Sequence, residues 1–261
     1  MEESGESVAL MDQAIESEFV EEVRDILDSC EVLIGNLRSR TLPAAEGLAQ
    51  IRRDMLNVEM RGSTLDQPLV TIVSHRLGEY LADIKETDLA GSKLDDIQAF
   101  VDNIRHALDG KVEAAHSAKV VRALPARTVG GFNPADVKIT NVEVLLVIAD
   151  KSTARIVERE LAACGYRSCC VRSPFQAIEM AVRTKPDMVI VSGVLDDLSG
   201  VDLANAFSAM PSTRDLPVAI LTSFSWGHSS LDNLPSRVPI IRKGPNFGDD
   251  LAEAFARLHI T

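Results

Sequence analysis

The sequence has few aromatic residues and few cysteines, and each shortage excludes a class of protein. Aromatic residues make up 4% of the 261 residues, while 46% are hydrophobic, so the cores must be built mainly from aliphatic side chains. The cysteines have neither the spacing of a disulfide framework nor that of zinc ligands: Cys30, Cys164, Cys169 and Cys170. We therefore expect a reduced protein without a structural metal.

Long apolar runs, a secretory signal and nucleotide-binding motifs are also missing from the sequence. No apolar stretch approaches the ~20 residues that a transmembrane helix needs. Residues 1–13 are acidic and lack the basic start and apolar stretch of a signal peptide. The chain contains no G-x-x-x-x-G-K-[ST] motif, and no G-x-G-x-x-G follows a predicted strand. We expect a cytoplasmic protein that neither enters membranes nor uses a nucleotide loop.

Negative charge is concentrated in the first part of the chain. Residues 1–110 hold 23 Asp+Glu against 10 Lys+Arg, whereas residues 111–261 hold 16 against 17. An acidic surface repels phosphate backbones, so nucleic acid is not an expected partner. The acidic residues form either a solvated helical surface or a docking face for a basic partner, and the sequence leaves both open.

Residues 17–110 have the hydrophobic periodicity of helices. Apolar residues recur every three or four positions along four stretches, which are separated near Pro43, Gly62 and Ser92. This pattern predicts an antiparallel four-helix bundle. We expect residues 1–16 to be a flexible acidic N-terminus, and residues 111–140, which lose the periodicity, to be a linker.

From residue 141 onward the pattern changes to alternating strands and helices. The predicted strands are continuous apolar runs at residues 142–148, 167–171, 188–191, 218–221 and 238–241. Continuous rather than alternating apolar residues indicate a parallel sheet that is covered on both faces. Residues 141–261 are thus predicted to form a doubly wound five-stranded parallel sheet, with sites at the carboxyl ends of its strands. The whole chain is predicted to be a multidomain protein of class α plus α/β.

Four stretches of this second part resemble the receiver domain of bacterial two-component response regulators. They are VEVLLVIADKS, SPFQAIEMAVRTKPDMVIVSGVLDDLSGVDL, VAILTS and PIIRKGP, in receiver order and spacing. The resemblance implies the receiver, flavodoxin-like fold. In that family an aspartate at the end of the third strand accepts a phosphoryl group, and two acids after the first strand help it to hold Mg²⁺. A Thr or Ser after the fourth strand and a Lys after the fifth bind the phosphoryl oxygens.

The resemblance carries over only part of that set. The acid pair maps onto Ala149 and Asp150, and the phosphoacceptor maps onto Ser192, while Thr222 and Lys243 match the hydroxyl and the lysine. Without the aspartate no aspartyl phosphate can form, and without the second acid Mg²⁺ binding is doubtful. A serine hydroxyl needs a base beside it, so we do not expect Ser192 to replace the aspartate. We predict a pseudo-receiver with no catalytic residue, no cofactor and no enzymatic activity.

The bundle resembles, more weakly, the histidine phosphotransfer domain. The signature of that family, H-x-x-K-G, lies on the exposed face of its second helix. Its best match here is VEMRG, which keeps a basic residue at Arg61 and the glycine at Gly62 but has Val58 in place of the histidine. Among the five histidines, only His75 lies mid-helix in a setting that we expect to be exposed. It is either an alternative phosphoacceptor or an ordinary surface histidine.

These observations favour a non-catalytic signalling adaptor or regulator of a bacterial two-component phosphorelay. Both domains would bind a histidine kinase, a phosphotransferase or a receiver protein, since docking needs only complementary surfaces. The bundle could also form a homodimer. Two alternatives stay open: an active histidine phosphotransfer protein that uses His75, and a sensor that binds a small anion or metabolite in the altered receiver pocket.

Overall fold

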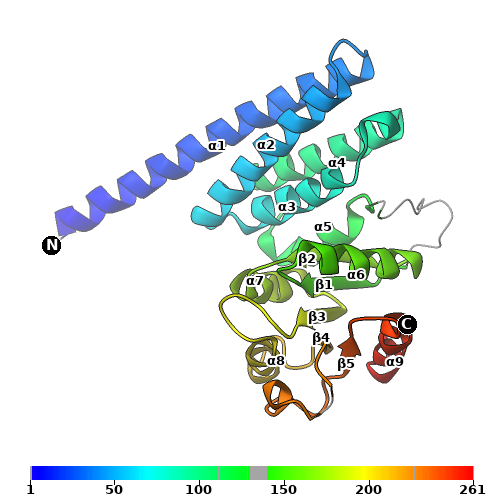
Figure 1. Ribbon diagram of the computed structural model, residues 1–261. Helices are drawn as coiled ribbons and strands as arrows, with labels where there is room; N and C mark the ends of the chain where they lie inside the picture. The colour runs from blue at the N-terminus through cyan, green and yellow to red at the C-terminus, as the bar shows by residue number, and fades with distance from the viewer. Residues whose placement is uncertain (1, 111, 128, 130–139, 226, 261) are drawn as a thin grey trace. The chain divides into compact units, whose positions relative to one another are not determined.

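The computed structural model describes residues 2–110, 112–127, 129, 140–225 and 227–260 (Figure 1). The chain divides into two compact units, Met1–Pro125 and Ala126–Thr261, which we call the N-terminal unit and the C-terminal unit. Residues 111, 128 and 130–139 of the predicted linker lie outside the described residues. Within the described part of the chain, no helix combines the length and the apolar character that a membrane span requires.

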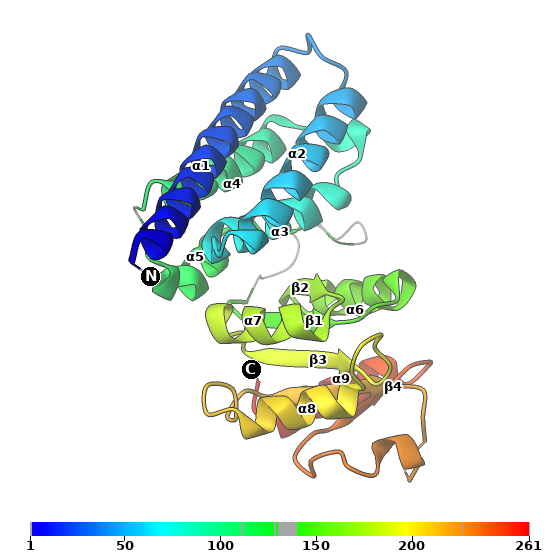
Figure 2. The same cartoon turned by 90° about the vertical axis from the view of Figure 1, so that its left-hand side faces the viewer.

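Four long helices make up most of the N-terminal unit: α1 (Glu2–Arg38), α2 (Ala44–Thr64), α3 (Pro68–Ala82) and α4 (Gly91–Leu108). A 3-10 turn, η1, comes before the last of them at Glu86–Asp88. Each long helix packs against the next one in sequence, and α1 also packs against α4, so the four enclose one core (Figures 1 and 2). This is the antiparallel four-helix arrangement that the periodicity predicts.

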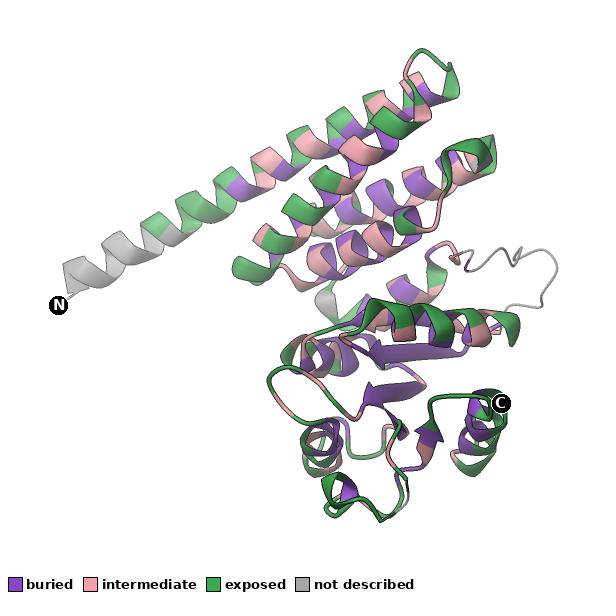
Figure 3. Cartoon of the chain, in the orientation of Figure 1, coloured by how far each residue is buried: buried purple, intermediate pink, exposed green. Residues whose placement is uncertain are grey.

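The core of this bundle is formed by the apolar stripe of each helix (Figure 3). On α1, Phe19 and Leu27 are fully buried, and on α2 Ile51 and Met55 are fully buried. Such side chains contribute about 1.5–3 kcal/mol each by leaving water. Aromatic residues are rare, and Tyr80 and Phe100 contact each other with ring centroids 5.3 Å apart. The core therefore rests mainly on aliphatic packing, as the composition predicts.

Two boundaries of the N-terminal unit differ from the prediction. Helix α1 already begins at Glu2, so residues 2–16 belong to the first helix and do not form a separate N-terminal segment. The stretch from Glu2 to Arg38 contains no proline and is rich in good helix formers, which allows the helix to continue. The predicted linker also contains a 3-10 turn, η2 (Ala114–His116), and a short helix, α5 (Ser117–Ala123). These two elements belong to the N-terminal unit, because Leu124, directly after α5, is part of the bundle core.

The C-terminal unit contains a five-stranded sheet in the order β2-β1-β3-β4-β5. All four neighbouring pairs are parallel. The strands are β1 (Glu143–Val147), β2 (Arg167–Val171), β3 (Met188–Ser192), β4 (Val218–Thr222) and β5 (Ile240–Arg242). Every residue of β1, β3 and β4 is buried (Figure 3), which is why these strands read as continuous apolar runs.

Helices cover both faces of this sheet. They are α6 (Lys151–Ala163), α7 (Pro174–Thr184), α8 (Gly200–Ala209) and α9 (Phe247–Arg257), with a 3-10 turn η3 at Ser229–Leu231. Helices α6 and α9 share one core with alternate residues of the strands, such as Val144 and Leu146. Helix α7 packs on β1 and β2, and α8 packs on β3 and β4, without joining that core, so these two cover the other face. The predicted fold class, a helical bundle followed by a doubly wound parallel sheet, is confirmed.

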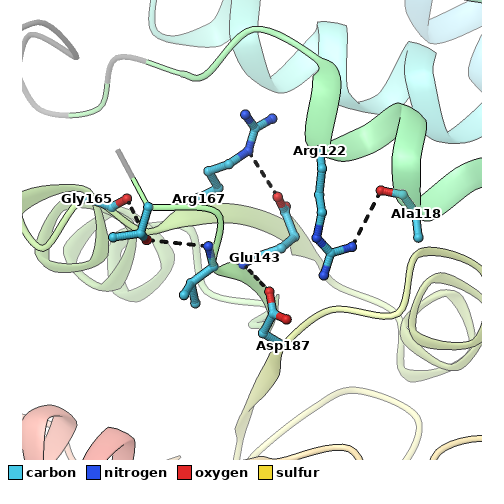
Figure 4. A network of polar contacts seen from close by, with 8 residues as sticks. Ala118, Arg122, Glu143, Gly165, Arg167 and Asp187 are labelled. Atoms are coloured by element: carbon cyan, nitrogen blue, oxygen red, sulfur yellow. Dashed lines mark hydrogen bonds and ion pairs between the residues drawn. The ribbon is translucent and has the colours of Figure 1, made fainter. Parts of the chain in front are cut away.

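Polar residues fix the amino-terminal end of the sheet (Figure 4). Arg167, at the start of β2, donates from Nε to Glu143 Oε2 at 3.2 Å, and the Glu143 amide donates to Asp187 Oδ2 at 2.8 Å. The Thr140 hydroxyl donates to the Gly165 carbonyl at 3.2 Å. This end of the sheet is thereby held by side chains, while the candidate site lies at the opposite, carboxyl end.

Candidate functional site

The carboxyl ends of β3 and β4 place two hydroxyl side chains at one edge of the sheet. Ser192 is the last residue of β3 and pairs in register with Leu221, the residue before Thr222. The amide of the next residue, Gly193, donates to the Leu221 carbonyl at 2.8 Å. Ser192 and Thr222 are 4% and 3% exposed. Both hydroxyls are therefore held on rigid, buried backbone.

Among the five predicted pocket positions, Asp150 is the one that carries a carboxylate; it follows β1 and caps α6. Its Oδ1 accepts a hydrogen bond from the Thr153 amide at 2.7 Å, which makes Asp150 the N-cap of the helix. This hydrogen bonding lowers the pKa of Asp150 below its ordinary value, and the positive charge of Lys243 lowers it further. Asp150 is thus an ionised, exposed group that already has a structural role, with Lys243 close enough to act on it electrostatically.

Lys243 reaches this edge because it directly follows β5. Its backbone amide donates to the Thr222 carbonyl at 2.9 Å, and its side chain is exposed. The Thr222 hydroxyl accepts a hydrogen bond from the Phe224 amide at 3.1 Å. The next residue, Gly244, has a φ of 128°, which a residue with a side chain would rarely adopt. All five predicted pocket positions, including Ala149 directly before Asp150, therefore lie at the same edge of the sheet.

The residues of this edge do not fit a carboxylate-held Mg²⁺ site. Mg²⁺ prefers oxygen ligands in octahedral geometry and is usually held through carboxylates. Ala149 offers no side-chain oxygen, Ser192 offers a neutral hydroxyl, and one oxygen of Asp150 is engaged in capping α6. The side chains at this edge are thus the ammonium group of Lys243, two neutral hydroxyls and a carboxylate that caps a helix.

The acidic loop after β3 returns to the sheet through a very close contact. Ser199 caps α8 and forms a reciprocal capping box with Asp202. The first residue of α8, Gly200, donates its amide to the Gly193 carbonyl at 3.1 Å. A Cβ atom at Gly200 would lie 2.2 Å from the Ser192 carbonyl oxygen. The glycine therefore allows α8 to begin directly against the end of β3.

Solved structures of receiver domains and response regulators are similar to part of this chain. Similar solved structures include the receiver domain of a sensor histidine kinase from Pseudomonas aeruginosa with magnesium in its active-site cleft, at 21% identity and a TM-score of 0.41. It is matched over 45% of this chain and 98% of its own. The receiver domain of a histidine kinase from Syntrophus aciditrophicus matches at 23% identity and a TM-score of 0.41, over 45% and 90% of the two chains. A response regulator from Thermotoga maritima in complex with Mg²⁺ and BeF matches at 21% and 0.39, over 45% and 98%. No protein-family model and no curated protein matches the chain.

The strand order decides the fold. A parallel sheet in the order 2-1-3-4-5 with helices on both faces is the flavodoxin-like arrangement that receivers share. The C-terminal unit has the flavodoxin-like fold, which receivers also have. In a doubly wound sheet of this kind, ligands bind at the carboxyl ends of the strands. Ser192, Thr222 and Lys243 lie at this edge, at the carboxyl ends of β3, β4 and β5.

The predicted phosphotransfer position in the bundle does not have the expected geometry. Val58 is 1% exposed and belongs to the core, whereas the matching position of the phosphotransfer signature is exposed. Arg61 forms an ion pair with Glu22 of α1. Gly62 is buried against α3, where an added Cβ would lie 2.8 Å from Thr71 Oγ1. The alignment of VEMRG with the exposed phosphotransfer signature is therefore wrong, because Val58 faces the core of the bundle.

His75 lies in α3 but is not the freely exposed side chain that we expected. Its Nδ1 is 2.9 Å from Oε1 of Glu59 on α2, and it is intermediate in burial. The sequence could not show this pair, because Glu59 and His75 meet only once α2 and α3 pack. A histidine held in this way has one ring nitrogen engaged with a carboxylate.

One arrangement beside the receiver edge was not predicted. Asp250 of α9 accepts hydrogen bonds from the backbone amide, Nε and Nη2 of Arg242, at 2.9, 2.8 and 2.8 Å. The Arg242 side chain lowers the pKa of Asp250, chiefly through these hydrogen bonds. Arg242 is the last residue of β5 and precedes Lys243, so the ion pair anchors the strand end that carries the lysine. An eight-residue separation between strand and helix gives no local sequence signal for such a pair.

Proposed function

We propose that this chain is a cytoplasmic signalling adaptor of a two-component phosphorelay that works by docking and not by phosphoryl transfer. The observation that carries the proposal is Ser192. It is buried at the end of β3, paired in register with Leu221 of β4, where a receiver needs a carboxylate nucleophile. A fold that keeps its surfaces while losing its nucleophile can still bind the partners of receivers.

The chemistry of the edge supports the absence of phosphoryl transfer. A serine hydroxyl becomes a nucleophile only with a base beside it. The carboxylate of Asp150 is engaged with the amide of Thr153 and has a lowered pKa, which makes it a poor base. With Ala149 as its neighbour, the edge also lacks the ligands for a Mg²⁺-assisted step. We therefore assign no catalytic residue and no cofactor to the chain.

The bundle supports the same proposal. The VEMRG motif supplies no exposed phosphotransfer position, because Val58 is a core residue. His75, the alternative phosphoacceptor, is tied to Glu59. A bundle that lacks the signature histidine can still contribute binding area to a histidine kinase, a phosphotransferase or a receiver protein, and this is the role that we propose for it.

Phosphoryl labelling tests the proposal. The full-length chain is incubated with Mg²⁺ and acetyl phosphate, or with a phosphorylated histidine kinase, and intact mass is measured with an ordinary receiver as the positive control. We expect no added phosphoryl group in the wild type or in the His75→Ala variant. An acid-stable or hydroxylamine-sensitive phosphoryl group on the C-terminal unit would refute the docking role. Labelling that His75→Ala abolishes would instead establish histidine phosphotransfer.

A second measurement separates docking from sensing by the altered pocket. Thermal unfolding is recorded with phosphate or sulfate, and binding is recorded with a purified histidine kinase fragment. Docking predicts kinase binding without stabilisation by the anions. Anion stabilisation that Lys243→Ala removes, without kinase binding, would favour the sensor and refute the adaptor.

A further inference from the structure

The N-terminal unit has an open groove between α1 and α2. Its volume is about 480 Å³, and residues from one face of each helix line it. Helix α2 packs much more closely on α3 than on α1, so the seam between α1 and α2 stays partly open. The lining residues all belong to α1 and α2, and one of them, Glu22, is paired with Arg61 of the predicted phosphotransfer motif.

The groove combines an apolar floor with an acidic rim. Ile26 and Leu33 of α1 are partly buried and pack against the bundle core, and Val32 beside them is 63% exposed. The carboxylates of Asp25 on α1 and Asp54 on α2 stand on the two sides. An exposed valine next to two half-covered aliphatic residues is costly in water unless another surface covers it.

The negative charge of the rim is largely uncompensated. Among the lining residues, Glu22 is paired with Arg61, but Asp54 accepts a hydrogen bond only from the neutral Gln50, at 2.8 Å. The charge of Asp54 also acts on the buried Cys30: burial is the main cause that raises the pKa of this thiol, and the negative charge of Asp54 is the second. A ligand with positive charge on both sides of an apolar stripe would therefore match the rim and the floor together.

Two more exposed apolar residues lie on this side of α1, beyond Glu22. Met11 and Ile15 precede Ile26 at spacings that place them on the same side of the helix, and they are 62% and 42% exposed. A partner of helical shape could lie in the groove and extend along these residues. Apolar anchors at i, i+3, i+4 and i+7 are the usual way in which one amphipathic helix fits such a groove.

We propose that this groove binds a basic amphipathic helix of a partner protein. The inference deepens the proposed docking function and rests on it, because it names the surface of the bundle and the chemistry of its partner. A second copy of the chain is a poor occupant: α1 itself carries 11 acidic and two basic residues, so two such helices repel each other. Nucleic acid and anionic membranes are disfavoured by the same charge.

The test uses a designed probe and the full-length chain. A fluorescent 18-residue Lys/Leu peptide with one apolar face is titrated with the protein, and anisotropy is measured at low salt and at ~150 mM salt. Two control peptides are used: a Glu/Leu peptide with the same apolar pattern, and a Lys/Leu peptide of scrambled order. We expect binding of the first peptide only, weakened but not abolished by salt, because the apolar floor is insensitive to screening.

Matched variants localise the binding. Asp25→Asn with Asp54→Asn removes two rim charges, while Asp102→Asn with Glu113→Gln removes two exposed charges elsewhere in the bundle. Asp102 is a close control for Asp54, because it also accepts a hydrogen bond from a glutamine four residues earlier, at 2.9 Å. We expect the dissociation constant to rise about five- to tenfold in the rim variant and less than twofold in the control.

The exposed valine gives a second, charge-independent variant. Val32→Ser should weaken peptide binding about threefold without unfolding the bundle, because the side chain is mostly in water. Equal affinity of the rim and control variants, or equal binding of the Glu/Leu peptide, would overturn the proposal. A dimer that the rim variant strengthens in ultracentrifugation would assign the groove to a second copy, also against it. Neither result would bear on the phosphoryl labelling, so failure of the groove and failure of the adaptor role are distinguishable.

Discussion

Gly200 provides the sharpest test of the geometry at the end of β3. Adding one methyl group, Gly200→Ala, would place Cβ 2.2 Å from the Ser192 carbonyl oxygen and 2.9 Å from Gly193 Cα. Carbon and oxygen atoms in van der Waals contact are at least about 3.3 Å apart, so α8 and β3 must separate by roughly 1 Å. Both atoms belong to backbone, and no side-chain rotation can relieve the clash.

The cost of that separation follows from what it breaks. The hydrogen bond from the Gly200 amide to the Gly193 carbonyl, 3.1 Å long, would be lost, at about 1 kcal/mol. Overpacking at a well-packed site adds about 1–3 kcal/mol. We expect Gly200→Ala to lower the free energy of unfolding of the C-terminal unit by about 2–4 kcal/mol. With a urea m-value near ~2 kcal/mol/M, the midpoint falls by about 1–2 M.

The assay must read the C-terminal unit separately from the bundle, because two units can unfold in two transitions. Urea unfolding is followed by hydrogen exchange and mass spectrometry of peptides that cover β3 and α8. Gly248→Ala is the matched control: Gly248 lies in the first turn of α9, and an added Cβ there meets nothing within 4 Å. We expect that control to be neutral or slightly stabilising. Equal midpoints for the two variants would refute the close approach of α8 to β3.

Three further outcomes follow from other contacts. Asp250→Asn removes a carboxylate whose pKa Arg242 lowers, so the variant should unfold at lower urea than wild type above about pH 5. Below about pH 4 the wild-type carboxyl becomes protonated, and the difference in urea midpoint should shrink. The buried thiol of Cys30, with its pKa raised to about 12, should resist iodoacetamide at pH 8 in the folded protein and react in urea, as mass spectrometry would show; labelling at equal rates would contradict its burial. Ser192→Asp combined with Ala149→Asp rebuilds a three-carboxylate edge, so millimolar Mg²⁺ should raise the melting temperature of the double variant and leave that of wild type unchanged.

The fold could be predicted from the sequence because its signals are local. The strands β1, β3 and β4 are buried on both faces, and a buried parallel strand reads as an unbroken apolar run. The last strand shows the limit of such signals. Apolar residues predict it at 238–241, but Pro239 has no amide to donate, and the strand begins at Ile240.

The site was predictable only where the chain topology fixes it. Residues that follow parallel strands meet at one edge, and so Ser192, Thr222 and Lys243 lie together. The five residues VEMRG do not by themselves show which side of helix α2 faces the core. For Val58 the signal was nevertheless present, since Ile51, Met55 and Val58 have the i, i+4, i+7 spacing of a buried face, and that spacing should have outweighed the motif.

The contact between His75 and Glu59 shows what sequence alone could not supply. It joins two helices through side chains that are 16 residues apart, and it depends on how α3 packs against α2. The pairing of Arg242 with Asp250 is of the same kind. Polar contacts between packed elements leave no periodic pattern, so only the three-dimensional structure reveals them.

The shortness of β5 has a consequence for how the protein behaves at high concentration. A strand at the border of a sheet exposes unpaired backbone groups that can recruit strands from other molecules and start aggregation. Here that border strand has three residues, ends at Arg242 and is followed by Lys243. An incoming strand would find few backbone groups to pair with and would meet the exposed charge of Lys243 next to the strand end. This border of the sheet therefore discourages pairing with strands of other molecules.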